Sequence, residues 1–181
     1  MARRERAGRS EPSFRNAFLL FVLRFLGILF VLSALSTLLS IQNRLGPLER
    51  GLALAAEQGA RLFGAHVVRH GNSLAVGGRL LEINHECTAF FVLLIYASFL
   101  FAYPATLAER LLGLVQGAVV LLVVNAVRLA GLAIVVASWP EFFDYFHEYF
   151  WQVLFLGLVT VLAQTWLNRL AVPRELSVLP R

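Results

Sequence analysis

Four long apolar runs dominate the pattern of hydrophobic and polar positions along this chain of 181 residues. A membrane-spanning helix needs about 20 predominantly apolar residues, and each run is close to that length. The runs extend over residues 16–41, 87–103, 107–137 and 149–170. They predict four transmembrane helices.

Local signals mark the ends of these helices. Thr106 followed by Glu109 has the spacing of a capping box at the start of the third run. Trp139-Pro140 stops that run, because proline has no backbone N–H to continue a helix. The first run exceeds the apolar core of a secretory signal peptide, about 7–15 residues, so we expect a retained anchor. The small residues of SALS (33–36) leave cleavage open.

Residues 42–86 separate the first two runs and are polar enough to lie outside the membrane. Residues 48–64 carry apolar side chains at helical spacing, which predicts a short interfacial helix. Residues 66–86 alternate and contain Gly-Asn and Gly-Gly, which predicts a small β-hairpin or meander. We therefore expect an all-α polytopic membrane protein with four transmembrane helices and a small extracytoplasmic helix plus β-hairpin.

Composition and charge support a membrane protein and suggest its orientation. The chain is 59% hydrophobic with a mean hydropathy of +0.72, more apolar than ordinary soluble domains. Its sixteen basic residues are all Arg and form no stripe, so we expect no nucleic-acid partner. Arginines in both tails and Arg110 fall on one side of a four-span chain, which the positive-inside rule makes cytoplasmic. Five Arg in residues 42–86 weaken this count, although long loops translocate largely regardless of charge.

Cys87 is the only cysteine, so it has no intramolecular disulfide partner. By itself it cannot form a multi-thiolate zinc site. It lies at the outer end of the second predicted span, where the dipole of the helix N-terminus favours a thiolate. Cys87 is therefore either a reactive thiol or a small buried hydrophobe, the commonest role of an unpaired cysteine.

Two further polar residues lie near the outer ends of predicted spans. His147 begins the fourth span, where Asp144 and Glu148 flank it and can orient the ring. The alternative for His147 is a hydrogen-bonded residue within an interfacial aromatic belt.

Arg128 lies nine residues, about 14 Å, before the expected end of the third span at residue 137. A charge at that depth costs at least a few kcal/mol, although snorkelling relieves part of the cost. Asn125 shares its helical face.

Cys87, His147 and Arg128 are expected to meet in an outward-facing pocket among spans two, three and four. Thiolate attack on a carbonyl carbon, proton transfer by the imidazole and oxyanion stabilisation by the guanidinium together make acyl transfer. His85 is a rival base, because it lies two residues from Cys87. A metal site from His85, Glu86, Cys87 and His147 lacks a tight spacing motif such as HExxH, so we expect neither a metal nor a cofactor.

These residues resemble the exosortase/archaeosortase family of membrane-embedded cysteine transpeptidases. The resemblance rests on Cys87 after a short hairpin, on NAVRLAG (125–131) and on FHEYFWQ (146–152), and it covers about residues 66–170. It implies that Cys87, Arg128 and His147 are the catalytic set. Bacterial members commonly show Cys-Ser-Gly, whereas this chain has Cys87-Thr88-Ala89. The four-span length is similar to compact forms of the family, such as the exosortase H type.

The resemblance also implies a substrate and a compartment. The expected substrates are membrane-anchored exported proteins with a C-terminal sorting signal, which consists of a short motif, one transmembrane helix and an Arg cluster. Cleavage at the outer face of the inner (cell) membrane would precede transfer to an acceptor, so the lipid bilayer is the other expected partner. Two other functions stay open: a non-catalytic scaffold subunit in which Arg128 pairs with an acidic residue of a partner, and a small transporter in which Arg128 binds an anion.

The predicted organisation therefore has five parts. They are a cytoplasmic basic tail (1–15), a transmembrane helix (16–41), an extracytoplasmic loop (42–86), a catalytic three-helix transmembrane core (87–170) and a cytoplasmic tail (171–181).

Overall fold

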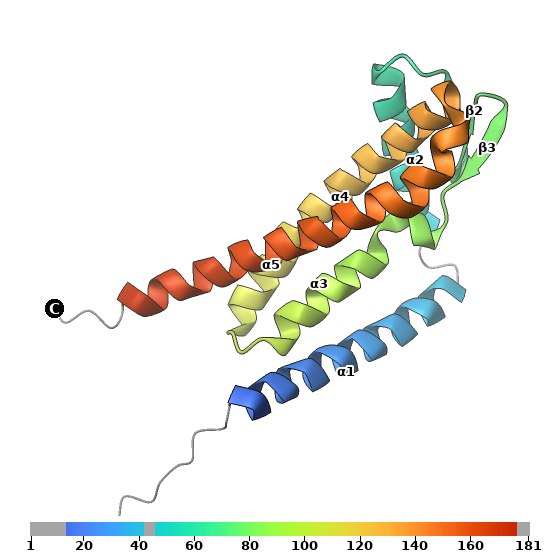
Figure 1. Ribbon diagram of the computed structural model, residues 1–181. Helices are drawn as coiled ribbons and strands as arrows, with labels where there is room; N and C mark the ends of the chain where they lie inside the picture. The colour runs from blue at the N-terminus through green and yellow to red at the C-terminus, as the bar shows by residue number, and fades with distance from the viewer. Residues whose placement is uncertain (1–13, 42–45, 177–181) are drawn as a thin grey trace, which may run out of the picture.

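The computed structural model describes residues 14–41 and 46–176, and helices dominate it (Figure 1). In chain order the elements are α1 (Phe14–Ile41), α2 (Gly46–Leu62), β1 (Val67–His70), β2 (Ser73–Val76), β3 (Arg79–Glu82), η1 (His85–Thr88), α3 (Phe90–Ala102), α4 (Leu107–Ser138), η2 (Pro140–Phe142), η3 (Tyr145–Phe150) and α5 (Trp151–Leu176). The long helices lie side by side, and α2 and the sheet lie together at one end (Figure 1). We call α2 with β1–β3 the cap, and the opposite end, at the α3–α4 connection, the turn end.

Three helical segments are long and apolar enough to cross a bilayer: Arg15–Leu38, Leu107–Ser138 and Pro140–Ala171. They correspond to the first, third and fourth apolar runs. The second run forms α3, whose 13 residues rise only about 20 Å. That rise is shorter than the hydrocarbon core of a bilayer, about 30 Å. The protein is thus a mostly helical membrane protein with three candidate spanning helices and a small sheet.

Glycine–aromatic contacts hold α3, α4 and α5 together towards the turn end. The ring of Tyr96 lies against Gly117, where an added Cβ would come within 2.1 Å of it. Trp166 of α5 occupies the corresponding space at Gly113, where a Cβ would lie 2.6 Å from the indole. The predicted capping box is confirmed, because the Thr106 side chain accepts from the Glu109 N–H and the Glu109 carboxylate accepts from the Thr106 N–H. α4 ends at Ser138, directly before Trp139-Pro140.

α1 lies along the outer side of α3 (Figure 1). The Phe21 ring meets the Phe99 ring edge-on, with 5.9 Å between the centroids. None of the apolar window of α1 is buried within the chain. This helix therefore offers most of its surface to the surrounding lipid.

The cap packs on the end of α4. The predicted interfacial helix forms as α2, but protein covers its apolar face: α2, the sheet and α4 share one core of buried residues, namely Leu52, Ala53, Ala56, Ala60, Val67, Leu74, Val76, Ile83, Leu129, Ala133 and Val136. Gly59 permits the close approach, because a Cβ there would lie 2.8 Å from the Cβ of Ala130. The predicted hairpin or meander is an antiparallel three-stranded sheet in the order β1-β2-β3.

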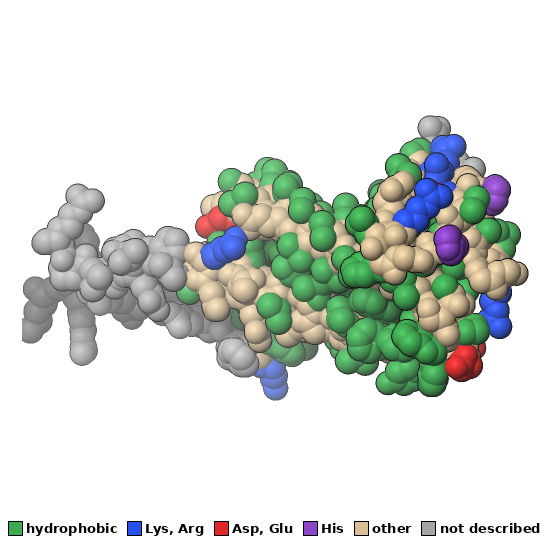
Figure 2. All heavy atoms as spheres, turned by 90° about the horizontal axis from the view of Figure 1, so that it is seen from above, with side chains coloured by type: hydrophobic (Ala, Val, Ile, Leu, Met, Phe, Trp, Pro, Cys, Tyr) green, Lys and Arg blue, Asp and Glu red, His purple; other side chains and the backbone are tan. Residues whose placement is uncertain are grey.

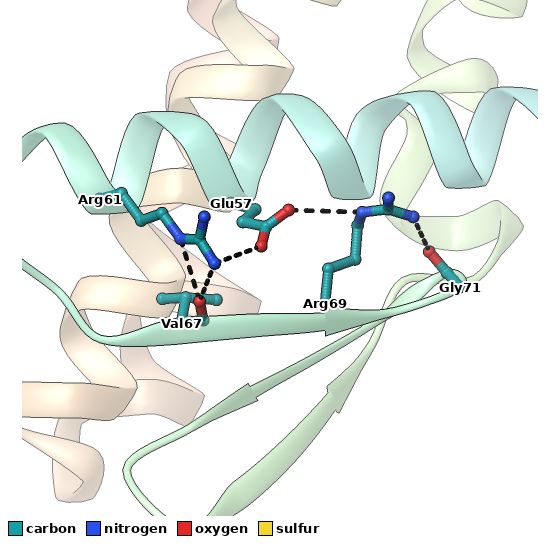
Figure 3. Close-up of polar contacts among 5 residues, drawn as sticks. All are labelled: Glu57, Arg61, Val67, Arg69 and Gly71. Carbon is teal, nitrogen blue, oxygen red and sulfur yellow. Dashed lines mark hydrogen bonds and ion pairs between the residues drawn. The ribbon is translucent and has the colours of Figure 1, made fainter.

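A buried carboxylate fastens α2 to β1 within the cap (Figure 3). Glu57 lies between Arg61 at 2.8 Å and Arg69 at 3.4 Å. Arg61 also donates to the Val67 carbonyl, and Arg69 donates to the Gly71 carbonyl. Because losing either cation leaves a buried charge poorly compensated, this network fixes the sheet against α2.

The exposed apolar surface of α4 marks the part of the protein that faces lipid. It runs from Leu107 to Val127, a rise of about 30 Å, which matches the hydrocarbon core. Figure 2 shows a hydrophobic middle with charged side chains gathered at the two ends of the helices. Arg128 follows this stretch directly, at the level where the cap begins to cover α4. It lies about 15 Å before the end of α4 at Ser138, close to the predicted distance of about 14 Å from the end of the helix, and its depth in the membrane stays a prediction.

Candidate active site

A cavity of about 360 Å³ lies where the end of β3, α4 and the segment before α5 meet. Cys87, Arg128 and His147 all line it. The structure therefore brings together the three side chains that the sequence singled out, each from a different segment. Their catalytic roles stay predictions.

Backbone hydrogen bonds fix the position of Cys87. Its N–H donates to Asn84, with the carbonyl oxygen at 3.0 Å and the side-chain Oδ1 at 3.3 Å. Its carbonyl oxygen accepts from Nδ2 of Asn125 at 2.8 Å, a contact that joins the turn to α4. α3 begins only at Phe90, so Cys87 lies in the turn η1 just before the helix and not in its first turn. The main chain thus holds the half-buried thiol at the cavity.

The turn after Cys87 contains a strained residue. Ala89 has φ 54° and ψ 14°, the left-handed conformation that glycine adopts readily. For a residue with a Cβ this conformation costs about 1–2 kcal/mol. The backbone of the turn after Cys87 therefore has a glycine-like conformation although the residue is Ala.

Arg128 is held beside the thiol and is only 9% exposed. Its guanidinium carbon lies 5.9 Å from the centroid of the Phe155 ring, a cation–π distance. It also interacts electrostatically with Cys87. Its Nε has no hydrogen-bond partner, and among the side chains that the structure describes no carboxylate pairs with it. Such a cation can bind an anion or a carbonyl oxygen that enters the cavity.

His147 lies in η3, a π-helix of six residues that continues into α5. Phe143 stacks on the imidazole, with 5.3 Å between the ring centroids and 19° between the planes. π-Helical turns are rare and are frequent at functional sites. The wider turn brings Gln152, five residues further on, into the lining of the same cavity. Sequence reasoning did not single out Gln152, although its place as a polar residue at the head of the apolar run of α5 was a usable signal.

Asn125 is fully buried one helical turn before Arg128. Its Nδ2 holds the carbonyl of Cys87, and its Oδ1 has no hydrogen-bond partner in the described part of the chain. The sequence placed Asn125 only on the same helical face as Arg128. The structure adds a contact through which Asn125 can position the thiol without touching a substrate.

The side chains of His85 and Glu86 lie outside the residues that the structure describes, so the rival base and the metal set that includes them stay predictions. Among the described side chains, no three of the His, Cys, Asp or Glu type lie close enough together to hold a metal ion.

Comparison with known proteins gives one result. The family model described as transmembrane exosortase (Exosortase_EpsH) matches residues 10–164, which include Cys87, Arg128 and His147. This match confirms the resemblance drawn from the three motifs. No curated protein and no solved structure matches the chain.

Proposed function

The chain belongs to the transmembrane exosortase family, and from that premise we propose that it is a membrane-embedded cysteine transpeptidase or protease. The observation that carries the proposal is the cavity that Cys87, Arg128 and His147 line together. A thiol, an imidazole and a guanidinium in one partly enclosed site supply the groups that acyl transfer needs.

The proposed reaction has two steps. In the first, His147 takes the proton of the Cys87 thiol, the thiolate forms a bond to the carbonyl carbon of a peptide bond, and Arg128 stabilises the resulting oxyanion. The carbon–nitrogen bond then breaks, and the leaving amine takes a proton from His147. In the second step water or an amine attacks the thioester while His147 accepts its proton. The carbon–sulfur bond then breaks, and the departing thiolate takes that proton from His147, which regenerates the thiol. Proton transfer by a placed imidazole contributes about 10²–10⁴ in rate.

We propose that the chain crosses the membrane four times, with η1 and α3 together forming the second crossing. The carbonyl oxygen of Cys87 accepts a hydrogen bond from Asn125, which lies about 27 Å along α4 from Leu107. The segment from the turn end to Cys87 therefore spans nearly the thickness of the hydrocarbon core. The arginines of both tails support a cap and a cavity on the extracytoplasmic side of the inner membrane.

The proposed substrates are exported proteins with a C-terminal sorting signal made of a short motif, one transmembrane helix and an Arg cluster. Family membership supports this class. A cavity at the membrane boundary also suits a bond that lies just outside a membrane-spanning helix.

The test follows the size of such a tailed reporter when it is co-expressed with this chain. Cys87→Ala and Cys87→Ser are expected to abolish processing, and His147→Ala is expected to slow it by about 10²–10⁴. His85→Ala separates the two candidate bases, because only the true base slows proton transfer when it is removed. If Cys87→Ala processes the reporter at the wild-type rate, the proposal is wrong and a scaffold subunit is favoured.

A further inference from the structure

A second hollow, of about 460 Å³, opens between α3 and α5 next to the thiol cavity. We call it the α3–α5 groove. Val92 and Ile95 form its α3 wall, and Phe155 and Val159 form its α5 wall. Arg128 and Gln152 line both the groove and the thiol cavity, so the two spaces adjoin at these side chains.

The groove lies at the depth of lipid. It extends from the level of Arg128 towards the turn end, alongside the stretch of α4 that exposes apolar side chains. Its α5 wall runs from Trp151 to Val159, a rise of about 12 Å. A groove of this length and volume accepts side chains from about two turns of one helix face and does not enclose a whole helix.

We infer that the α3–α5 groove is the docking site for the membrane-spanning helix of the substrate, which aligns the bond beyond that helix with Cys87. The inference rests on the proposed function and adds the surface that recognises the substrate. Its main support is that the groove adjoins the thiol cavity: the occupant must be apolar in the groove and a peptide in the thiol cavity, and one polypeptide that passes Arg128 meets both demands. A lipid chain fills the groove but brings no bond for the thiol.

Arg128 and Gln152 lie where the groove meets the thiol cavity. Between them they can hydrogen-bond to both kinds of backbone group, N–H and carbonyl, of such a substrate. A helix that enters the membrane from the cap side begins with N–H groups that have no partner within the helix. The side-chain oxygen of Gln152 can accept from them. The guanidinium of Arg128 can donate to carbonyl oxygens of the extended residues just before the helix. The same two side chains then hold the substrate and set its register over Cys87.

Filling the groove tests the inference. Ile95→Trp and Val159→Trp each place an indole where the substrate helix would lie, and each is expected to slow processing of the tailed reporter at least about tenfold. Val153→Trp and Val161→Trp are matched controls, because these exposed valines of α5 lie outside the groove lining. They are expected to process within about twofold of wild type. Labelling of Cys87 by a small thiol reagent, unchanged in all four variants, shows that the thiol cavity is intact.

Photo-cross-linking gives a second readout that does not need turnover. A photoreactive residue at Ile95 of the Cys87→Ala protein is expected to capture the reporter, and one at Val161 is not. Equal capture at both positions, or capture of lipid alone at Ile95, overturns the inference. If wild type processes the reporter and both groove variants do so at the same rate, the groove assignment fails while the proposed function stands. If wild type does not process the reporter, the proposed function fails, and the cross-link still decides whether the groove binds it.

Discussion

The two ends of the helical bundle differ in whether their buried polar groups have hydrogen-bond partners. Towards the turn end, the buried aromatic side chains place their polar tips on backbone carbonyls: the Tyr96 hydroxyl donates to Gly113 at 3.3 Å, and the Trp166 indole donates to Glu109 at 3.1 Å. The same rings fill the space beside two glycines. One atom there is an exception, because Nε of Arg110 has no partner although its NH2 donates to Tyr103.

At the thiol cavity, exceptions to ordinary packing gather. Oδ1 of Asn125 and Nε of Arg128 are buried without a hydrogen-bond partner among the residues that the structure describes, and Ala89 is held in a left-handed conformation. Native proteins pair nearly all buried polar groups, and local strain persists only where the surrounding structure enforces it. The polar groups at the turn end are thus mostly satisfied within the packed helices. Those near the thiol cavity leave donor and acceptor atoms with which a bound molecule can pair.

The largest effect that sharpens this contrast is expected at Arg128. Arg128→Met removes a buried cation that, among the described residues, has no carboxylate partner, so thermal stability in detergent should stay the same or rise. Processing of the tailed reporter should fall by about 10²–10³, the usual loss of an oxyanion-stabilising group. Thermal unfolding and reporter processing are measured on the same preparation. Lower stability with normal processing would assign Arg128 to the scaffold.

The turn end should respond in the opposite way. Gly117→Val places a side chain against the Tyr96 ring and should destabilise the protein by about 1–3 kcal/mol. Processing should fall only as far as the amount of folded protein falls. Gly157→Val is the matched control, because nothing lies within 4 Å of a Cβ at Gly157. Equal melting temperatures for the two variants would contradict the packing described here.

The smallest effect is expected at Ala89. Ala89→Gly should stabilise the protein by up to about 1 kcal/mol and retain processing, because glycine adopts the left-handed conformation without strain. The same change inside a helix, Ala97→Gly in α3, should destabilise by about 1 kcal/mol. Thermal unfolding of the two variants should therefore shift in opposite directions. A shift of the same sign in both would remove the case for strain after Cys87.

The sequence predicted the features that local signals determine. The capping box at Thr106 and the Trp139-Pro140 stop set both ends of α4 to within one residue. Alternation and Gly pairs predicted the small sheet, and the motifs around Cys87, Arg128 and His147 led to the family. These features depend on residues that are close together in the chain.

Features that depend on contacts between distant segments were not predictable in the same way. The amphipathic pattern of α2 fits a lipid surface and a protein surface equally well, and the core that α2 shares with the sheet and α4 shows that it packs on protein. The depth of Arg128 in the membrane stays a prediction, since it depends on how the assembled helices lie in the bilayer. The place of Gln152 in the cavity depends on a π-helical turn that hydrophobic periodicity does not reveal.

The central claim is that the thiol of Cys87 forms a covalent bond with the substrate. The most direct measurement is rapid acid quenching of the wild-type protein during turnover of the tailed reporter, followed by mass spectrometry of the peptide that carries Cys87. The account predicts that this peptide gains the mass of the N-terminal part of the reporter and loses it again on treatment with neutral hydroxylamine, as a thioester does. An unmodified Cys87 peptide while cleavage proceeds at its full rate, or an adduct on another residue, would contradict it.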